Sequence, residues 1–90
     1  MFAKSTKILV VDDSLSHRQL IFDGLKKLGF KNIITCENVN DAFSKLNVEF
    51  QGGDPFELVL SDLNMPGLSG LDFLKLVRET DKFITLPFLL

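Results

Sequence analysis

Three aspartates of this 90-residue chain directly follow short apolar segments. Asp12 and Asp13 follow the run Ile8–Val11, and Asp62 follows the run Leu58–Ser61. If these runs are neighbouring parallel strands, their carboxyl ends bring the three carboxylates close together. Clustered carboxylates repel one another unless a cation binds them, and Mg²⁺ prefers such oxygen ligands. An aspartate beside bound Mg²⁺ can also attack phosphorus, which would form an aspartyl-phosphate.

The segments between these acids predict alternating strands and helices. The segments 7–11, 33–36 and 57–61 are mostly apolar, which is typical of buried strands, and 86–90 predicts the start of a fourth. Apolar residues at helical spacing fill the intervals. Such alternation predicts an open, doubly wound α/β fold with a parallel sheet and right-handed crossovers. Its binding site is expected beyond the carboxyl ends of the strands, where the aspartates fall.

The first predicted helix has start and stop signals. Ser16 is its expected N-cap, Gln19 would complete a capping box, and Leu15 and Leu20 could form a hydrophobic staple. Its apolar face is expected to comprise Ile21, Leu25 and Leu28, and Gly29 would end it. Gly24 in its interior costs about 1 kcal/mol relative to alanine. A close contact with another element would explain that glycine.

The other two helices carry similar signals. Asn38 is the expected N-cap of the second, whose apolar face is Val39, Ala42, Phe43 and Leu46. The chain is then expected to loosen from Asn47 to Pro55, where Gly-Gly-Asp-Pro is typical of a loop. Ser69 and Asp72 predict the start of the third helix, which would end near Glu79 and present Leu71, Leu74 and Val77.

Composition and charge exclude several classes of protein. Apolar residues are 46% and charged residues 24% of the chain, which is typical of a globular core and not of a disordered segment. The length allows one small domain, residues 1–90. A net charge of −2 gives no electrostatic basis for binding nucleic acid or a membrane surface, and no apolar run could span a bilayer. Cys36 has no internal disulfide partner, so a reducing, cytoplasmic location is expected.

Two motifs identify a family resemblance. Val10-Val11-Asp12-Asp13-Ser14 and Ser61-Asp62-Leu63-Asn64-Met65-Pro66-Gly67-Leu68-Ser69-Gly70 closely resemble the receiver domain of two-component response regulators, the CheY-like proteins. The resemblance covers the whole chain and implies a flavodoxin-like sheet with strand order 2-1-3-4. It further implies a phosphoryl-accepting signalling switch and not an enzyme with a free substrate. Asn64-Met65-Pro66 favours a chemotaxis-type regulator.

The resemblance assigns a role to each site residue. Asp62 is the implied phosphoacceptor, and Asp12 and Asp13 are the acidic pair that positions Mg²⁺. Asp13 and Asp62 would be direct carboxylate ligands, and Asn64 would add its backbone carbonyl. A sensor histidine kinase or a small phosphodonor would supply the phosphoryl group.

The family pattern also includes parts that these 90 residues do not contain. A receiver has a fifth strand, two more helices, a Ser or Thr after its fourth strand and a Lys after its fifth. Leu90 falls inside the predicted fourth strand, and Lys4 and Lys7 lie at the opposite end of the first strand. We therefore expect a C-terminally incomplete domain that has the acid–metal half of the site and impaired phosphotransfer. The fourth strand would be an apolar edge, which favours a fragment or a homo-oligomer.

Several alternatives compete with the switch. The chain could be a structural or oligomerisation module without phosphotransfer. A flavin binder needs a Gly/Ser/Thr loop where Asp12-Asp13 would repel phosphate, and a phosphatase needs a D-x-D spacing that is absent. A calcium loop is excluded because Phe73 stands where the bidentate glutamate belongs. His17 is expected to be a solvated helix residue, and Cys36 a small buried one.

Overall fold

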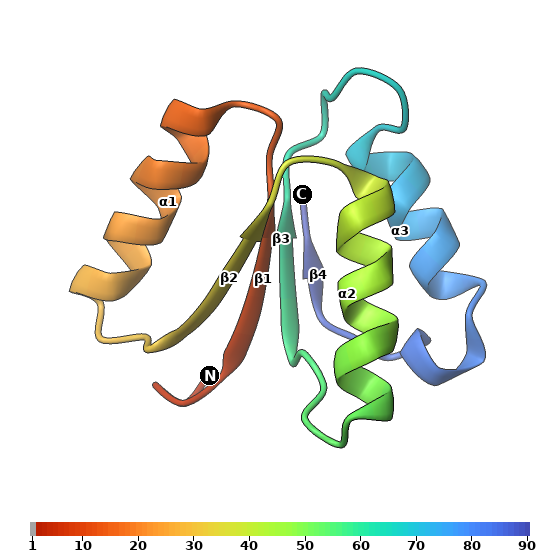
Figure 1. The fold of residues 1–90 in the computed structure, drawn as a ribbon, viewed down its shortest axis with the longest axis horizontal. Coiled ribbons are helices and arrows are strands. Elements are labelled where there is room, and N and C mark those ends of the chain that lie inside the picture. Colours follow the sequence, from red (N-terminus) through yellow and green to blue (C-terminus); the bar gives the residue numbers. More distant parts are fainter. Residues whose placement is uncertain (1) are drawn as a thin grey trace.

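The computed structural model describes residues 2–90 and contains a parallel sheet of four strands with helices on both faces (Figure 1). The elements are β1 (Lys7–Val11), α1 (Leu15–Lys27), β2 (Asn32–Cys36), α2 (Val39–Gln51), β3 (Leu58–Ser61), α3 (Gly70–Arg78) and β4 (Phe88–Leu89). The strand order is β2-β1-β3-β4, as the family resemblance predicts. Helix α1 covers one face, whereas α2 and α3 cover the other.

The register of the sheet brings the ends of β1 and β3 to the same level. Val11 lies opposite Cys36 on one side and Ser61 on the other. The pairing continues one residue further, since the amide of Asp12 donates to the carbonyl of Cys36 (3.1 Å) and that of Asp62 donates to the carbonyl of Val11 (2.8 Å). Adjacent strands therefore deliver Asp12 and Asp62 side by side at the carboxyl edge.

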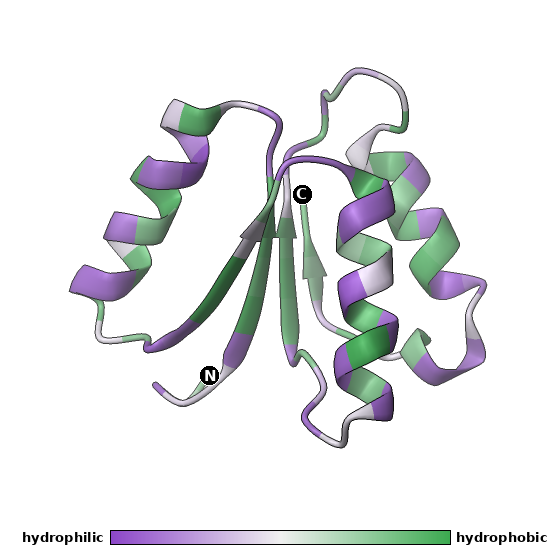
Figure 2. Ribbon diagram, in the orientation of Figure 1, coloured by the Kyte–Doolittle hydropathy of each residue, from purple (hydrophilic) through white to green (hydrophobic). Residues whose placement is uncertain are grey.

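The central strand β1 is buried on both faces, which explains why every residue after Lys7 in it is apolar (Figure 2). Ile8 and Val10 pack with residues of α1, while Leu9 and Val11 belong to the core beneath α2 and α3. All four side chains are fully buried. Within residues 2–90, the helices are too short or too polar to cross a bilayer.

Helix α1 begins earlier than the sequence predicts. Its N-cap is Ser14 and not Ser16, because the Ser14 hydroxyl accepts from the amide of His17 (3.4 Å). The predicted staple is wrong, since Leu15 and Leu20 are both about 70% exposed. Leu28, expected on the apolar face, is exposed at the C-cap.

Of the two predictions made for glycines in and just after α1, one is confirmed and one is wrong. Gly29 ends the helix with a φ of 96°, the left-handed conformation that favours glycine. The contact expected to explain Gly24 is wrong, because a Cβ at that position would have no atom within 4 Å among the described residues.

Helix α2 starts as predicted but continues to Gln51, so the expected loosening at Asn47 is wrong. Asn38 caps it by accepting from the amide of Asp41 (2.8 Å). The last turn is held by long-range contacts: Glu49 pairs with Lys7 (2.7 Å), and the ring of Phe50 packs edge-on against another ring with centroids 5.7 Å apart. The loop is confined to the residues that follow.

Helix α3 has the predicted capping box, in which Ser69 and Asp72 exchange hydrogen bonds. Its buried face is rotated from the prediction, since Leu71 is exposed whereas Phe73 and Val77 are fully buried. The segment between α3 and β4 contains a 3-10 helix, Asp81–Phe83, whose last side chain is buried.

Candidate metal and phosphoryl site

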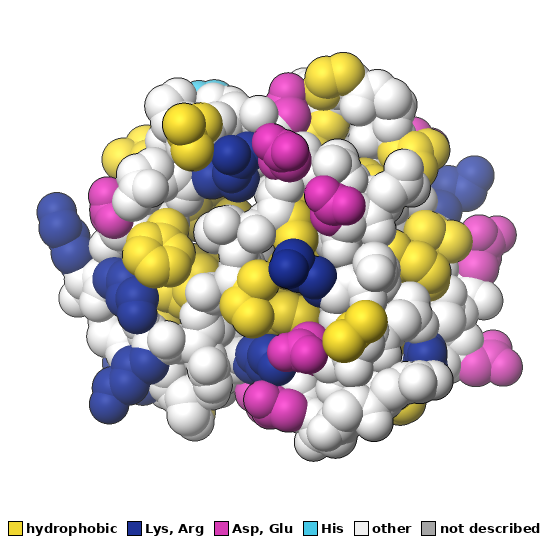
Figure 3. Space-filling view, in the orientation of Figure 1, with side chains coloured by type: hydrophobic (Ala, Val, Ile, Leu, Met, Phe, Trp, Pro, Cys, Tyr) yellow, Lys and Arg dark blue, Asp and Glu magenta, His cyan; other side chains and the backbone are white. Residues whose placement is uncertain are grey.

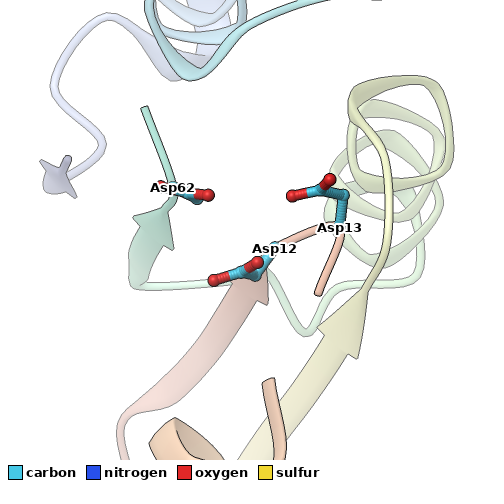
Figure 4. A group of neighbouring side chains, drawn as sticks. All are labelled: Asp12, Asp13 and Asp62. Atoms are coloured by element: carbon cyan, nitrogen blue, oxygen red, sulfur yellow. The ribbon is translucent and has the colours of Figure 1, made fainter. Parts of the chain in front are cut away.

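The three predicted acids converge at the carboxyl edge of the sheet (Figure 4). Asp12 and Asp13 follow β1, Asp62 follows β3, and one carboxylate oxygen from each lies within 4.8 Å of the others. Asp12 is buried, Asp62 half-buried and Asp13 exposed. The side chains therefore span from the sheet to solvent, as expected of a cation site that must admit a ligand from outside.

Asp12 is the most firmly held member of this cluster. Its Oδ1 accepts from the amide of Ser14 (2.9 Å), which turns the chain directly from β1 into α1. This turn explains why Ser14 and not Ser16 caps the helix. Its Oδ2 lies 3.7 Å from Nδ1 of His17. His17 itself is mostly exposed, in agreement with its expected solvated position.

Asp62 is positioned by the backbone on both sides of it. The Ser61 hydroxyl donates to the carbonyl of Asp62 (3.0 Å), and the amide of Asp62 donates to the carbonyl of Val11 in β1. Beside its carboxylate lies a cavity of about 250 Å³ bounded by α1, β3 and the end of the chain. The cavity lining contains no lysine or arginine from residues 2–90: Val11, Asp12, Ile21, Leu60, Ser61, Asp62, Leu89 and Leu90.

Asn64 lies on the exposed turn between β3 and α3 and is not part of the carboxylate cluster. Its implied role through the backbone carbonyl stays a prediction. The donor set that the structure does bring together consists of three carboxylates, which are hard oxygen ligands. That chemistry fits Mg²⁺, which takes one or two carboxylates and completes its shell with water or phosphate oxygens.

Sequence reasoning missed Arg18, which contacts the acidic loop, whereas Gly70 is part of the second family motif. The Arg18 guanidinium donates through Nη1 to the backbone carbonyl of Asp12 (2.7 Å). Gly70 lies so close to the carbonyl of Asp62 that a side chain there would overlap it. A signal was available for Arg18, because a cation near a helix N-terminus opposes the helix dipole and so calls for another reason to be there.

The clustering predicts opposite effects of Asp13→Asn on folding and on metal binding. Removing one of three like charges should stabilise the metal-free fold, by less than about 1 kcal/mol because Asp13 is exposed. The same change removes a ligand and should weaken Mg²⁺ binding about tenfold or more. Thermal melting in EDTA at low ionic strength and Mg²⁺ titration by calorimetry measure the two effects.

The matched control is Glu79→Gln, because Glu79 is an exposed acid at the far end of α3. It should leave Mg²⁺ affinity unchanged. An Asp13→Asn variant with an unchanged metal-free melting temperature would argue against electrostatic coupling within the cluster.

Comparison with known proteins gives the family. A model of the response regulator receiver domain matches residues 8–89. Chemotaxis protein CheY-3 of Vibrio cholerae is 37% identical over 87 residues, covering 97% of this chain and 63% of that protein. Chemotaxis protein CheY1 of Helicobacter pylori is 33% identical over 84 residues, covering 93% and 64%.

A solved structure agrees with these relatives. Vibrio cholerae CheY4 superposes with a TM-score of 0.80 at 31% identity, covering 93% of this chain and 65% of that one. The chain thus spans slightly less than two thirds of the length of the proteins it matches. It belongs to the response regulator receiver domain family of two-component signalling.

Proposed function

We propose that this receiver domain accepts a phosphoryl group on Asp62, with Asp12 and Asp13 holding Mg²⁺ beside it. The observation that carries the proposal is the convergence of three carboxylates within 4.8 Å at the carboxyl edge of the sheet. Asp62 is the half-buried member and borders the open cavity, so a phosphodonor can approach it. Asp12 is fixed by hydrogen bonds and serves to orient the cation.

The proposed reaction moves one phosphoryl group. A carboxylate oxygen of Asp62 attacks phosphorus, forming a new P–O bond while the bond from phosphorus to the donor breaks. From a phosphohistidine the leaving imidazole takes up a proton, and from acetyl phosphate the acetate leaves as an anion. Bound Mg²⁺ would neutralise charge on the phosphoryl oxygens and the carboxylates. Hydrolysis by water restores the Asp62 carboxylate and releases phosphate.

In this role the chain is a switch within a phosphorelay and not an enzyme with a free substrate. A sensor histidine kinase or a small phosphodonor is its upstream partner, and the charge added to Asp62 biases the surrounding loops. We place this chemistry in the cytoplasm. Residues 2–90 supply no lysine or arginine to the cavity beside Asp62, so we expect these residues alone to form the adduct slowly.

The test is incubation of the chain with acetyl phosphate and Mg²⁺, read by intact mass. A gain equal to one phosphoryl group is expected, and it should disappear in EDTA and in Asp62→Asn. The matched control is Asp23→Asn, because Asp23 is an exposed acid on α1 outside the cluster. That variant should gain the same mass as the native chain.

Two results would count against the phosphoacceptor role. One is the absence of any adduct at saturating donor and Mg²⁺. The other is an adduct that persists in Asp62→Asn, which would place the modification elsewhere.

The alternative is a structural or oligomerisation module that pairs through β4. Its support is that, among residues 2–90, β4 pairs with β3 alone, and that Leu89 and Leu90 are more than half exposed. Membership of the receiver family does not favour this role as the sole function. Light scattering distinguishes the two, because pairing through β4 requires a particle heavier than the 10.1 kDa chain.

A further inference from the structure

Arg18 bonds to the acidic loop although it lies outside the carboxylate cluster. It lies in the second turn of α1, and its Nη1 donates to the backbone carbonyl of Asp12 at 2.7 Å. The side chain is partly buried. This bond joins α1 to the loop that precedes it, across six residues of sequence.

The guanidinium of Arg18 is committed to this carbonyl and not to an acid. Ion pairs among residues 2–90 do not include it, although acidic and basic side chains lie beside one another on this face of the molecule (Figure 3). Arg18 lines two cavities of about 400 and 300 Å³, and Thr35 of β2 lines both of them as well. Glu37 and Asp41 line the larger cavity together with Arg18, yet the guanidinium hydrogen-bonds to the backbone of Asp12.

That contact completes the fixing of the Asp12 backbone. The amide of Asp12 donates to the carbonyl of Cys36 in β2, and its own carbonyl accepts from Arg18. The carbonyl belongs to the peptide plane that joins Asp12 to Asp13. Holding this plane therefore sets the direction in which Asp13, the exposed acid of the cluster, leaves the strand.

We infer that Arg18 is a positioning residue for the divalent-cation site, through the Asp12–Asp13 peptide. The inference rests on the proposed function, because it concerns the same Mg²⁺. In other metal sites, mutating a group that orients a ligand without touching the metal typically lowers metal affinity by about 10- to 100-fold. Arg18 acts on affinity in two opposite ways, since its positive charge by itself repels Mg²⁺.

These opposite effects make the test decisive. Arg18→Met removes both the donor and the charge, so a positioning role predicts Mg²⁺ binding about tenfold weaker, whereas a purely electrostatic role predicts tighter binding. Arg18→Lys keeps the charge but not the guanidinium, so a positioning role predicts weaker binding than in the native chain, whereas a purely electrostatic role predicts unchanged binding. Calorimetric Mg²⁺ titration measures all variants, and NMR amide spectra without Mg²⁺ establish that each is folded.

Arg78→Met is the matched control. Arg78 makes the same kind of bond, from Nη1 to the carbonyl of Phe83 (3.0 Å), at the end of α3 away from the acids. The Arg78→Met variant should bind Mg²⁺ as the native chain does. Unchanged binding would show that losing an arginine–carbonyl bond matters only where the bond is to Asp12.

Each outcome decides the inference. Weaker binding in Arg18→Met with Arg78→Met unchanged supports it, and if Arg18→Met does not fold, weaker binding in Arg18→Lys supports it alone. Equal or tighter binding in the folded Arg18→Met variant overturns it and leaves the proposed function intact. Failure of the native chain to bind Mg²⁺ removes both.

Discussion

Replacing Gly70 with alanine is expected to destabilise the fold by about 3 kcal/mol and to disturb the acid site with it. Gly70 is the buried first residue of α3. A Cβ there would overlap the carbonyl oxygen of Asp62 and lie 2.9 Å from Cδ2 of Leu90. The obstacle is backbone at the end of β3, so no side-chain rotation relieves it. Either α3 or the loop carrying Asp62 must move.

Thermal unfolding followed by circular dichroism measures this effect. For a domain of this size, a 3 kcal/mol loss corresponds to a fall in Tm of roughly 12 °C or more. Mg²⁺ affinity should fall as well, because relief of the overlap displaces Asp62. A Gly70→Ala protein that melts within a few degrees of the native chain would show that α3 does not start this close to β3.

Gly24→Ala is the matched control for this glycine. Gly24 lies inside α1, where an added Cβ meets no atom of the described residues within 4 Å. The same chemical change should therefore stabilise the chain by up to about 1 kcal/mol, since alanine is the better helix former. Opposite signs at the two positions would separate the overlap at Gly70 from the general effect of replacing glycine.

The sheet and the acid cluster are the parts of the structure that the sequence predicts best. A strand buried on both faces needs apolar residues on both, so β1 and β3 are visible as the apolar runs Ile8–Val11 and Leu58–Leu60. Parallel strands end at a common edge, which is why acids that follow two such runs meet. The caps at Asn38 and Ser69 are also local, because each involves residues three positions apart.

The predictions that failed depend on contacts between distant residues. Helix α2 continues past Asn47 because Glu49 and Phe50 bind residues far away in the sequence, and a helix is stabilised mainly by such packing. The start of α1 depends on a turn made by Asp12, which competes with an equally plausible cap two residues later. Local patterns do not rank these alternatives.

The rotation of α3 has the same origin. Two sets of residues fit helical spacing in this segment. The predicted set is Leu71, Leu74 and Val77, and the residues that the structure buries are Phe73 and Val77. Which set is buried depends on the residue of α3 that faces the sheet where the helix begins. That residue is Gly70, because the space beside the Asp62 carbonyl has no room for a side chain.

Lys7→Met is expected to cost about 2 kcal/mol at neutral pH. The Lys7 ammonium is buried at the amino end of the sheet, where it donates to Glu49 (2.7 Å) and to the carbonyl of Asp54 (2.8 Å) and lies 5.0 Å from the centre of the Phe56 ring. Removing it breaks these bonds. The cost stays below that of a fully buried pair because the carboxylates of Glu49 and Asp54 are 35% and 80% exposed and regain water.

The pH dependence of this cost identifies its electrostatic part. Burial lowers the pKa of Lys7, but its hydrogen bonds to Glu49 and Asp54 outweigh burial and hold that pKa above its ordinary value. A pKa that is higher in the folded state makes the contribution complete below about pH 10.4 and removes it as the pH rises through the folded-state pKa. The difference between the native chain and Lys7→Met should therefore be constant from pH 7 to about 10 and shrink above that.

Urea unfolding of both proteins across this range provides the measurement, and their difference cancels the titration of the remaining groups. The chain contains no tyrosine, so no phenol titrates in the same window. Lys82→Met is the control, because Lys82 is an exposed lysine that also lies beside phenylalanine rings without an ion pair among the described residues. It should change the stability by less than about 0.5 kcal/mol at every pH. A Lys7→Met cost that is equally large at pH 7 and pH 11 would mean that Lys7 stabilises the fold through its packing alone and that the ion pairs with Glu49 and Asp54 add nothing.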